Sequence, residues 1–313
     1  MKRGCLIAAA VGGALLILAV AAVDFRYGLL RSSPRINHTD YAPARSSFRL
    51  AIDPEPALPV LLPKLAAQNP PLPVPTPLLR YVMPYEIAFM ADPDPSLLQS
   101  ETVLFVNDRR LGPVLAQHSA QLGITQRFPR IQWETPGLQR ERRGVLMQTG
   151  AEPLSQRNLA LLEEYWGTVS PLSSLELEGG HFMEAVMDLR DGRGFLLLAD
   201  WLGRGVPPDS LTHPTQLVHF VKNVATIRIF LNLPSESDLA VQFRIECRPE
   251  ATDSDVNSLR FLLNSSFAQL QQALDAYYGI SIEGAIEVEG LRILGAYRLS
   301  PVDRVLAAMG FRF

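Results

Sequence analysis

The stretch VATIRIFLNLPSESDLAVQFRIEC, residues 224–247, decides the fold of this chain. Between Leu239 and Cys247, apolar side chains at the odd positions alternate with Ala, Gln, Arg and Glu at the even positions. This alternation predicts a strand with one buried and one solvated face, because successive side chains of a strand point to opposite faces. The short polar loop Pro-Ser-Glu-Ser-Asp joins this strand to residues 224–233. We therefore expect an antiparallel hairpin, with Cys247 as a buried and unreactive thiol.

A long helix is predicted directly after this hairpin. Thr252 and Asp255 form a capping-box pattern, in which each side chain can bond to the other residue's backbone. Apolar residues then recur at helical spacing from Val256 to Tyr277. Gly279 stands where helices commonly end, because glycine adopts the left-handed conformation without strain.

A second hairpin and a final short helix complete the chain. AIEVE at 285–289 and LRILGAYRL at 291–299 are separated by Gly290, and Pro301 opens the last helix. The order strand, strand, helix, hairpin, helix predicts an α+β fold, with an antiparallel sheet and helices packed on one of its faces.

An earlier part of the chain shows a similar series. The strands are YEIAFMAD (85–92), TVLFVN (102–107) and RGVLMQTG (143–150), with one helix opened by Pro113 and another at SQRNLALLEEYW (155–166). We expect two tandem ββαβα-like units, at 81–170 and 223–313. The alternative is chance, since short strands and helices alternate in most mixed folds.

The segment 171–222 connects the two predicted units. Asp191-Gly192 is a turn signal, and it favours a hairpin that runs from FMEAVMDL (182–189) into FLLLADWL (195–202). Helical spacing competes with strand alternation in this segment. We expect strands here.

The N-terminal residues 1–27 contain nineteen uncharged residues from Cys5 to Val23, about the length that crosses the hydrocarbon core of a bilayer. Lys2 and Arg3 precede this run and favour translocation of the rest of the chain. The small residues at 19–22 allow cleavage as a signal peptide, whereas the length favours a retained signal anchor. Retention predicts an inner-membrane protein with its folded part in the periplasm or outside the cell, and cleavage predicts secretion.

Residues 28–80 hold eleven of the 25 prolines of the chain. Proline fixes its own φ angle and favours extended geometry in the residue before it, so this range predicts a semi-rigid neck. The Leu and Val residues among the prolines indicate that part of this neck lies along the folded domain.

Composition excludes several classes of function. The formal net charge of −3 gives no broad attraction for nucleic-acid phosphates, so no nucleic-acid partner is expected. Cys5 and Cys247 are the only cysteines, which excludes a paired-cysteine zinc site and a disulfide within the exported part. Dinucleotide, phosphate-loop and GxSxG signatures are absent from the sequence, so we expect no cofactor.

Four polar residues are the candidates for catalysis: His181, Glu184, Asp188 and Asp191. A metal would need these and other ligands, such as His213 or His219, to converge, and a strand at 182–189 would point His181 and Glu184 to opposite faces. We therefore expect no metal. The aspartates, like Asp92 and Asp94 of DPDP, stand in turns, where aspartate is common for conformational reasons.

Three arginines, Arg140, Arg142 and Arg143, form a candidate patch for an anionic partner, with a charged edge strand that resists aggregation as the alternative. Together these features predict a membrane-anchored extracytoplasmic protein with a non-catalytic role, either binding a partner such as another envelope protein or acting in envelope assembly. The alternatives are an envelope hydrolase with an unrecognised site, and a carrier of a small ligand or lipid with an enclosed apolar pocket.

Overall fold

A computed structural model describes residues 38, 46–66, 83–107, 139–142, 145–154, 156–166, 176–203, 218 and 221–308. The strands in these ranges are β1 (Phe48–Ile52), β2 (Glu86–Asp94), β3 (Gln99–Asn107), β4 (Gln139–Arg142), β5 (Val145–Pro153), β6 (Met183–Asp188), β7 (Val224–Asn232), β8 (Leu239–Cys247), β9 (Ser281–Glu289) and β10 (Arg292–Ser300). The helices are η2 (Glu55–Ala57), α2 (Leu58–Ala66), α6 (Gln156–Trp166), α7 (Arg193–Gly203), α9 (Asp253–Tyr278) and α10 (Val302–Ala308).

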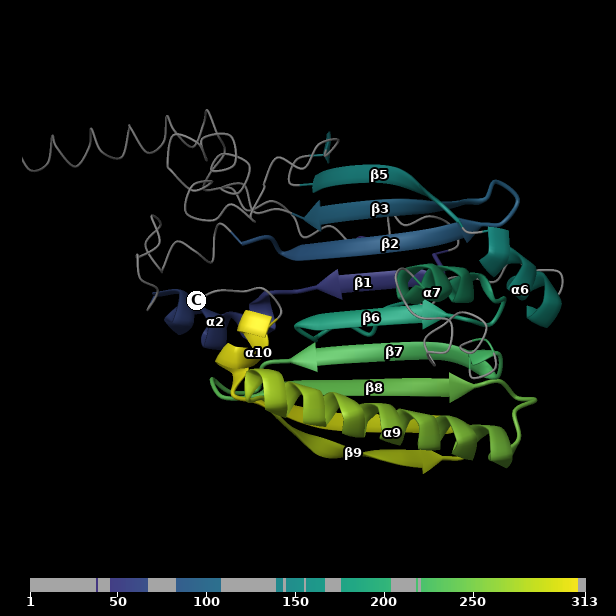
Figure 1. Ribbon diagram of the computed structural model, residues 1–313. Coiled ribbons are helices and arrows are strands. Elements are labelled where there is room, and N and C mark those ends of the chain that lie inside the picture. The colour runs from purple at the N-terminus through teal and green to yellow at the C-terminus, as the bar shows by residue number, and fades with distance from the viewer. Residues whose placement is uncertain are drawn as a thin grey trace, which may run out of the picture.

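The ten described strands form one sheet in the order β4-β5-β3-β2-β1-β6-β7-β8-β10-β9 (Figure 1). Every neighbouring pair is antiparallel. The predicted α+β class with a large antiparallel sheet is therefore confirmed.

The two halves of this sheet have the same order of strands. The first five strands lie in the order 1-2-3-5-4 and the last five in the order 6-7-8-10-9, so the same order occurs twice. The two runs meet at the pair β1·β6, where Phe48 is opposite Met187. In each run, one helix follows the strand that comes first in the sequence, α2 after β1 and α7 after β6. Another helix follows the strand that comes last in the sequence, α6 after β5 and α10 after β10.

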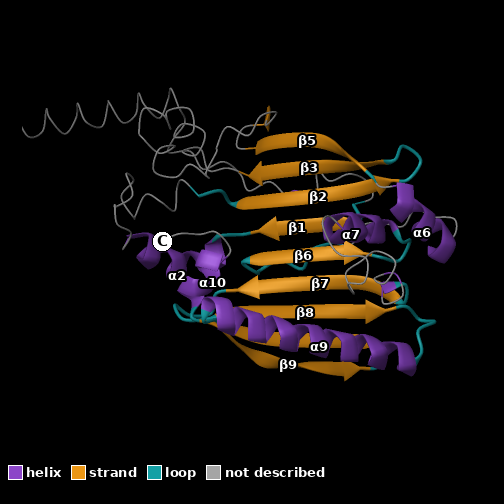
Figure 2. Ribbon diagram, viewed as in Figure 1, coloured by secondary structure: helices purple, strands orange, loops and turns teal. Residues whose placement is uncertain are grey.

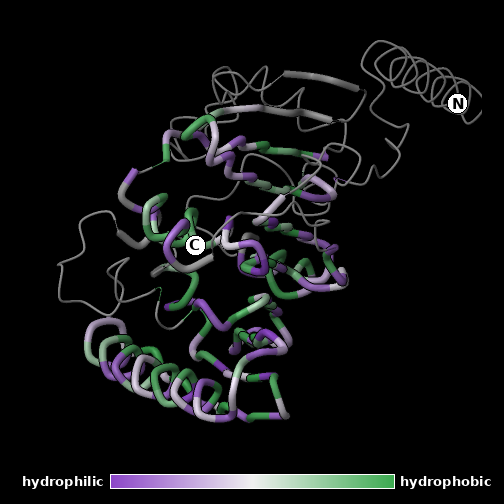
Figure 3. Tube along the Cα trace, turned by 90° about the vertical axis from the view of Figure 1, so that its right-hand side faces the viewer, coloured by the Kyte–Doolittle hydropathy of each residue, from purple (hydrophilic) through white to green (hydrophobic). Residues whose placement is uncertain are grey.

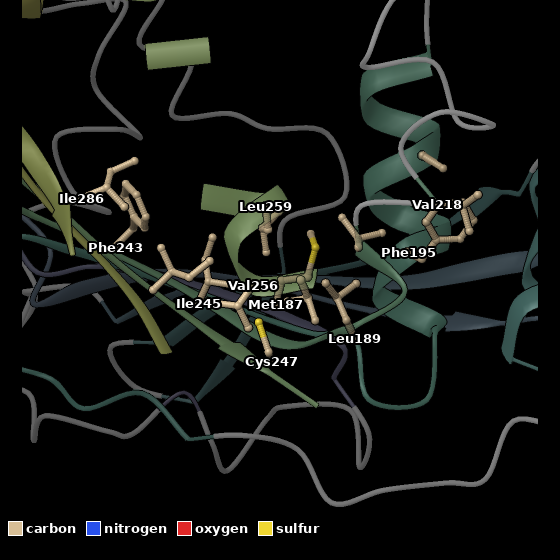
Figure 4. Close-up of a cluster of buried hydrophobic side chains, with 14 residues drawn as sticks. Met187, Leu189, Phe195, Val218, Phe243, Ile245, Cys247, Val256, Leu259 and Ile286 are labelled. Atoms are coloured by element: carbon tan, nitrogen blue, oxygen red, sulfur yellow. The ribbon is translucent and has the colours of Figure 1, made fainter. Parts of the chain in front are cut away.

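The predicted hairpin of residues 224–247 is present as β7 and β8 (Figure 2). Phe243, Ile245 and Cys247 of β8 are buried in a core cluster together with Phe195 of α7 and Val256 of α9 (Figure 4). Both helices therefore cover the same face of the sheet. Cys247 is buried as expected, and burial raises the pKa of its thiol.

The long helix α9 has the predicted ends. The Asp255 amide donates to Thr252 Oγ1 at 3.3 Å, and the Thr252 amide donates to the Asp255 carboxylate at 2.9 Å. Gly279 ends the helix with a φ of 60°. The second predicted hairpin is also present, because β9 pairs with β10 around Gly290, which has a φ of 59°.

Residues 46–66 correct the extent of the predicted neck. β1 lies in the middle of the sheet between β2 and β6, and α2 packs on α10 through Val60, Val305 and Leu306. This part of the range 28–80 therefore belongs to the folded domain and is not a spacer. The predicted anchor from Cys5 to Val23 and the rest of the predicted neck, apart from His38, lie outside the described residues. Among the residues that are described, no helix is both long and apolar enough to cross a membrane.

The predicted hairpin into FLLLADWL is wrong, because residues 193–203 form the helix α7. Phe195 packs on the sheet while Leu196 packs on α6, so the helix is buried on two sides and its sequence lacks a polar face. Gly194 allows a close approach to β6, since a Cβ atom there would lie 2.2 Å from the carbonyl oxygen of Asp188. The Asp191-Gly192 turn therefore leads into a helix.

Candidate functional site

The four candidate residues lie in two groups, one at each end of β6. His181 and Glu184 belong to the start of the strand, and Asp188 and Asp191 to its end. Glu184 and Asp188 are four positions apart in one strand, which separates their Cα atoms by about 13 Å. The structure therefore does not bring the four together in one site.

Glu184, the carboxylate of the first group, is buried, at 2 % exposed. Its two oxygens accept hydrogen bonds from the backbone amides of Glu178 and Gly179, both at 2.8 Å. Nη1 of Arg228 on β7 lies 3.3 Å away. Glu184 thus fixes the loop before β6 and compensates a nearby cation, which is a structural role.

Two arginines stand side by side next to this loop. Arg228 of β7 is directly opposite Arg244 of β8, and like charges in such a pair repel each other. Arg244 Nη1 bonds to Glu178 Oε1 at 2.9 Å, and Arg228 Nη1 donates to the Glu176 carbonyl at 2.9 Å. Glu178 and Glu184 therefore neutralise both guanidinium groups.

His181 shares a face of the sheet with Glu184, which corrects the expectation that they point to opposite faces. The histidine precedes the strand, and its ring lies 4.5 Å from the ring of Phe230, the residue opposite Glu184 on β7. Its Nδ1 atom is 3.0 Å from Nδ2 of Asn232. The described part of the chain contains no cluster of three or more His, Cys, Asp or Glu residues arranged to hold a metal. His213 and His219 lie outside it.

The second group begins with an ion pair. Arg190 donates through Nε to Asp188 Oδ1 at 2.9 Å and through Nη2 to Asp188 Oδ2 at 2.5 Å. This two-point contact fixes the guanidinium against the carboxylate. The Asp188 side chain is thereby engaged in holding the turn after β6.

Asp191 and Asp92 flank the guanidinium of Arg193 at the first turn of α7. Arg193 Nε lies 3.4 Å from Asp191 Oδ2, and Nη1 lies 3.6 Å from Asp92 Oδ1 on β2. Burial raises the pKa of Asp92 to about 6, although Arg193 acts in the opposite direction. Burial also raises the pKa of Asp191. Two carboxylates with raised pKa values share one cation here.

The sequence does not indicate that Arg193 contacts both Asp92 and Asp191. Asp92 and Asp191 stand in turn motifs 99 residues apart, and Arg193 follows the second motif with no local sign of a partner. The only signal is the pattern of Asp next to Pro or Gly, which is common in turns. Asp94 lacks this contact, and its carboxylate accepts from Ser96 instead.

The two edge strands of the described sheet, β4 and β9, differ in charge. β4 at one end contains Arg140 and Arg142, with Glu141 between them, and Arg143 lies outside the described residues. β9 at the other end contains Glu283, Glu287 and Glu289 and no cation. Arg140 and Arg142 of the predicted anionic-partner patch therefore stand on an edge strand of the described sheet.

Apolar side chains are also exposed on α9. They are Phe261 (74 %), Leu270 (45 %), Tyr277 (82 %) and Tyr278 (54 %). Figure 3 shows hydrophobic residues along this helix, which lies at the margin of the molecule. They do not share one face, because Phe261 is on the opposite side of the helix from Leu270 and Tyr277 at 100° per residue.

Comparison with known proteins adds little to this picture. No protein-family model and no curated protein matches the chain. A solved structure of TP0453, crystal form I, is similar at a TM-score of 0.38 and 7 % sequence identity, over 88 % of this chain and 97 % of that one. A similarity of this size carries no conclusion about this chain.

Proposed function

We propose that this chain is a membrane-anchored extracytoplasmic protein with a non-catalytic role in binding or envelope assembly. The observation that carries the proposal is that the candidate catalytic groups are engaged in holding the fold. Glu184 accepts two backbone amides, Asp188 is paired with Arg190, and the described His181 contacts are Asn232 and Phe230. None of these three is paired with a second candidate as a nucleophile or general base requires.

The proposed location rests on the sequence of the first 27 residues. The uncharged run from Cys5 to Val23 follows Lys2 and Arg3, so the chain after it is exported. The experiment is protease treatment of spheroplasts together with mass determination of the full chain. Digestion of the folded part from outside, and an intact N-terminus in the membrane fraction, are expected. Protection from the protease would refute export, and a mature protein that starts at Ala22 or Val23 would refute retention.

We also propose that the sheet is a tandem duplication, with units that begin at β1 and β6. The repeated strand order, and the helices after corresponding strands, support this proposal. These units are larger than the ranges 81–170 and 223–313, because each gains a strand and a helix at its start. A doubled sheet provides a wide scaffold whose two edges are equivalent in position and different in sequence.

A second candidate function, hydrolysis, is supported by one observation. Asp92 and Asp191 have raised pKa values and share Arg193, and such perturbed pairs are concentrated in active sites. Structural ion-pair networks produce the same perturbation. Activity on a panel of ester, phosphoester and glycoside substrates that is lost in Asp92→Asn, with the fold retained, would favour the hydrolase over the binding role.

A further inference from the structure

Three arginines lie in one row across the sheet. In the strand registers Arg228 of β7 is opposite Arg244 of β8 on one side and opposite Val186 of β6 on the other. Val186 is in turn opposite Arg49 of β1. Directly opposed residues point to the same face, and Phe243, the residue before Arg244, packs in the core under α7 and α9. The three arginines, which we call the arginine row, are therefore on the face that these helices do not cover.

Residues 176–180, which we call the strap, supply acidic partners to this row. Glu178 Oε1 accepts a hydrogen bond from Arg244 Nη1 at 2.9 Å and lies 3.8 Å from Arg228 Nη1. The backbone carbonyl of Glu176 accepts from the same Nη1 atom of Arg228 at 2.9 Å. The strap thus offers the row a carboxylate together with a backbone carbonyl, which an extended acidic segment of another protein would also offer.

Arg49 lacks an acceptor for one of its donors. It is 6 % exposed, and its Nε atom makes no hydrogen bond in the described part of the chain. Burial lowers the pKa of Arg49, and the charge of Glu176 acts in the opposite direction. Buried polar groups normally have hydrogen-bond partners. A ligand with a carboxylate next to this atom would supply the missing acceptor.

We propose that the arginine row is the docking site for a short acidic segment of a partner protein, and that the strap occupies this site when no partner is bound. The proposal rests on the binding role proposed above and gives the chemistry of the partner. The segment is extended and carries acidic residues at alternate positions, as Glu176 and Glu178 do in the strap. Its backbone amides replace those of Glu178 and Gly179 as donors to Glu184.

No residue of the strap belongs to a hydrophobic core cluster of the described chain. Both of its glutamates are exposed, and Leu177 between them is only partly buried. Gly179 and Gly180 border open space, since a Cβ atom on either would meet nothing within 4 Å. A segment with few buried apolar contacts opens at a low free energy. A partner segment can therefore replace the strap without disturbing the core.

Arg228 and Arg244 also have contacts that do not involve the strap. The guanidinium carbon of Arg244 lies 5.8 Å from the centre of the Phe230 ring, which is a cation–π distance. Arg228 Nη1 lies 3.3 Å from a carboxylate oxygen of the buried Glu184. Both contacts come from strands of the sheet, so an incoming segment meets guanidinium groups whose positions are already fixed.

The length of the site is set by the residues that follow in the row. Beyond Arg244 come Leu294 of β10 and then Glu287 of β9, which is two strands or about 10 Å away. Glu287 is exposed, and its charge repels an anion that extends past Arg244. The row therefore takes a short acidic segment and disfavours a long polyanion.

The test measures, by fluorescence anisotropy, how a labelled peptide with the strap sequence SSLELEGG (173–180) binds to the full-length chain in detergent micelles. The wild type is expected to bind it weakly, because its own strap competes for the row. Glu176→Gln/Glu178→Gln weakens this competitor, so the peptide should bind about tenfold more tightly or better. Addition of Arg244→Gln to this double variant should weaken binding again by about tenfold, because a charged hydrogen bond is lost.

Two controls and one further measurement complete the test. Glu163→Gln/Glu164→Gln removes the same charge from α6 and should bind the peptide like the wild type. A peptide with Gln in place of both Glu residues should not bind. Hydrogen exchange of the Glu178 and Gly179 amides in the wild type should accelerate at saturating peptide, because the strap then leaves Glu184. Circular dichroism checks that every variant is folded.

Three results would each overturn the proposal: equal binding of the peptide by all variants, equal binding of the glutamine peptide, and unchanged exchange of the two amides at saturating peptide. Displacement of the peptide by an equal concentration of inorganic phosphate would also overturn it, since the row would then be a site for a small anion. Export is tested separately by the protease experiment and hydrolysis by the substrate panel. Failure of docking would therefore not be confused with failure of the proposed function.

Discussion

Nη1 of Arg193 lies 3.6 Å from Oδ1 of Asp92, and this ion pair joins the first turn of α7 to β2. The same arginine faces Asp191, so one cation compensates two carboxylates. Asp92 is only 16 % exposed, and burial outweighs the arginine in setting its pKa. This contact makes the stability of the fold sensitive to pH.

Asp92→Asn tests that sensitivity. The pKa of Asp92 is raised from 3.8 to about 6, so the protonated carboxyl favours the folded state. Its contribution is fully present below the unfolded pKa and is lost as pH rises through the folded pKa. The wild-type free energy of unfolding should therefore fall between pH 4 and 6 on account of this group, and Asp92→Asn should remove that fall. Above pH 6 the variant should be more stable by on the order of 1–2 kcal/mol, measured by urea unfolding.

Asp94→Asn is the control for this experiment. Asp94 stands two positions along the strand, and its pKa is lowered chiefly by the hydrogen bond from the Ser96 side chain. Its replacement should leave the fall between pH 4 and 6 in place. If the two variants have the same pH profile, Asp92 is not the group responsible.

Glu184→Gln should destabilise the protein by about 1–3 kcal/mol at pH 7, because the amides of Glu178 and Gly179 lose a charged acceptor and Arg228 loses its ion pair with Glu184. The matched variant is Glu178→Gln, whose side chain is 42 % exposed and should contribute less than about 1 kcal/mol. Urea unfolding measures both. Hydrogen exchange of the Glu178 and Gly179 amides should accelerate in Glu184→Gln, and equal effects of the two variants on stability would contradict the structural role of Glu184.

Gly194→Ala tests the close approach of α7 to β6. The added Cβ would meet a backbone carbonyl at 2.2 Å, so the helix must shift and stability should fall by roughly 1–3 kcal/mol despite the better helix propensity of alanine. At Gly150 the corresponding contact is the Thr102 hydroxyl at 2.9 Å, and the end of a side chain can move. Thermal unfolding should therefore show a larger loss for Gly194→Ala than for Gly150→Ala. The reverse order would contradict the packing of α7.

Thr252→Ala should cost about 1 kcal/mol, because the Asp255 amide loses the cap that begins α9. Thr252→Ser keeps the hydroxyl and should have most of the wild-type stability. Urea unfolding of the two variants measures the difference. A serine variant as unstable as the alanine variant would show that the hydroxyl does not hold the end of the helix.

Local patterns in the sequence predict the second half of the fold well. The alternation in 239–247 and the capping box of Thr252 and Asp255 each involve residues that are close together in the sequence. The hairpin and the helix can therefore be predicted from them. α7 was missed because it is buried on two sides, which removes the polar face that marks a surface helix. β1 was missed because it is short and lies among prolines.

Contacts of the candidate site depend on pairings far apart in the sequence. Glu184 meets Arg228 because β6 and β7 are neighbours, and Asp92 meets Arg193 because α7 packs near β2. No spacing in the sequence indicates either pair. The candidate residues could therefore be named from residue type, but their partners could not.

The central position of β1 has a consequence for how the chain reaches its final form. Synthesis delivers a protein from its N-terminus, so β1 emerges early, while its second neighbour β6 follows only after β2 to β5. Until then one side of β1 exposes unpaired backbone groups, which is the condition for mispairing with another chain. The second edge of β1 thus stays unpaired until the first five strands have been made and β6 follows them.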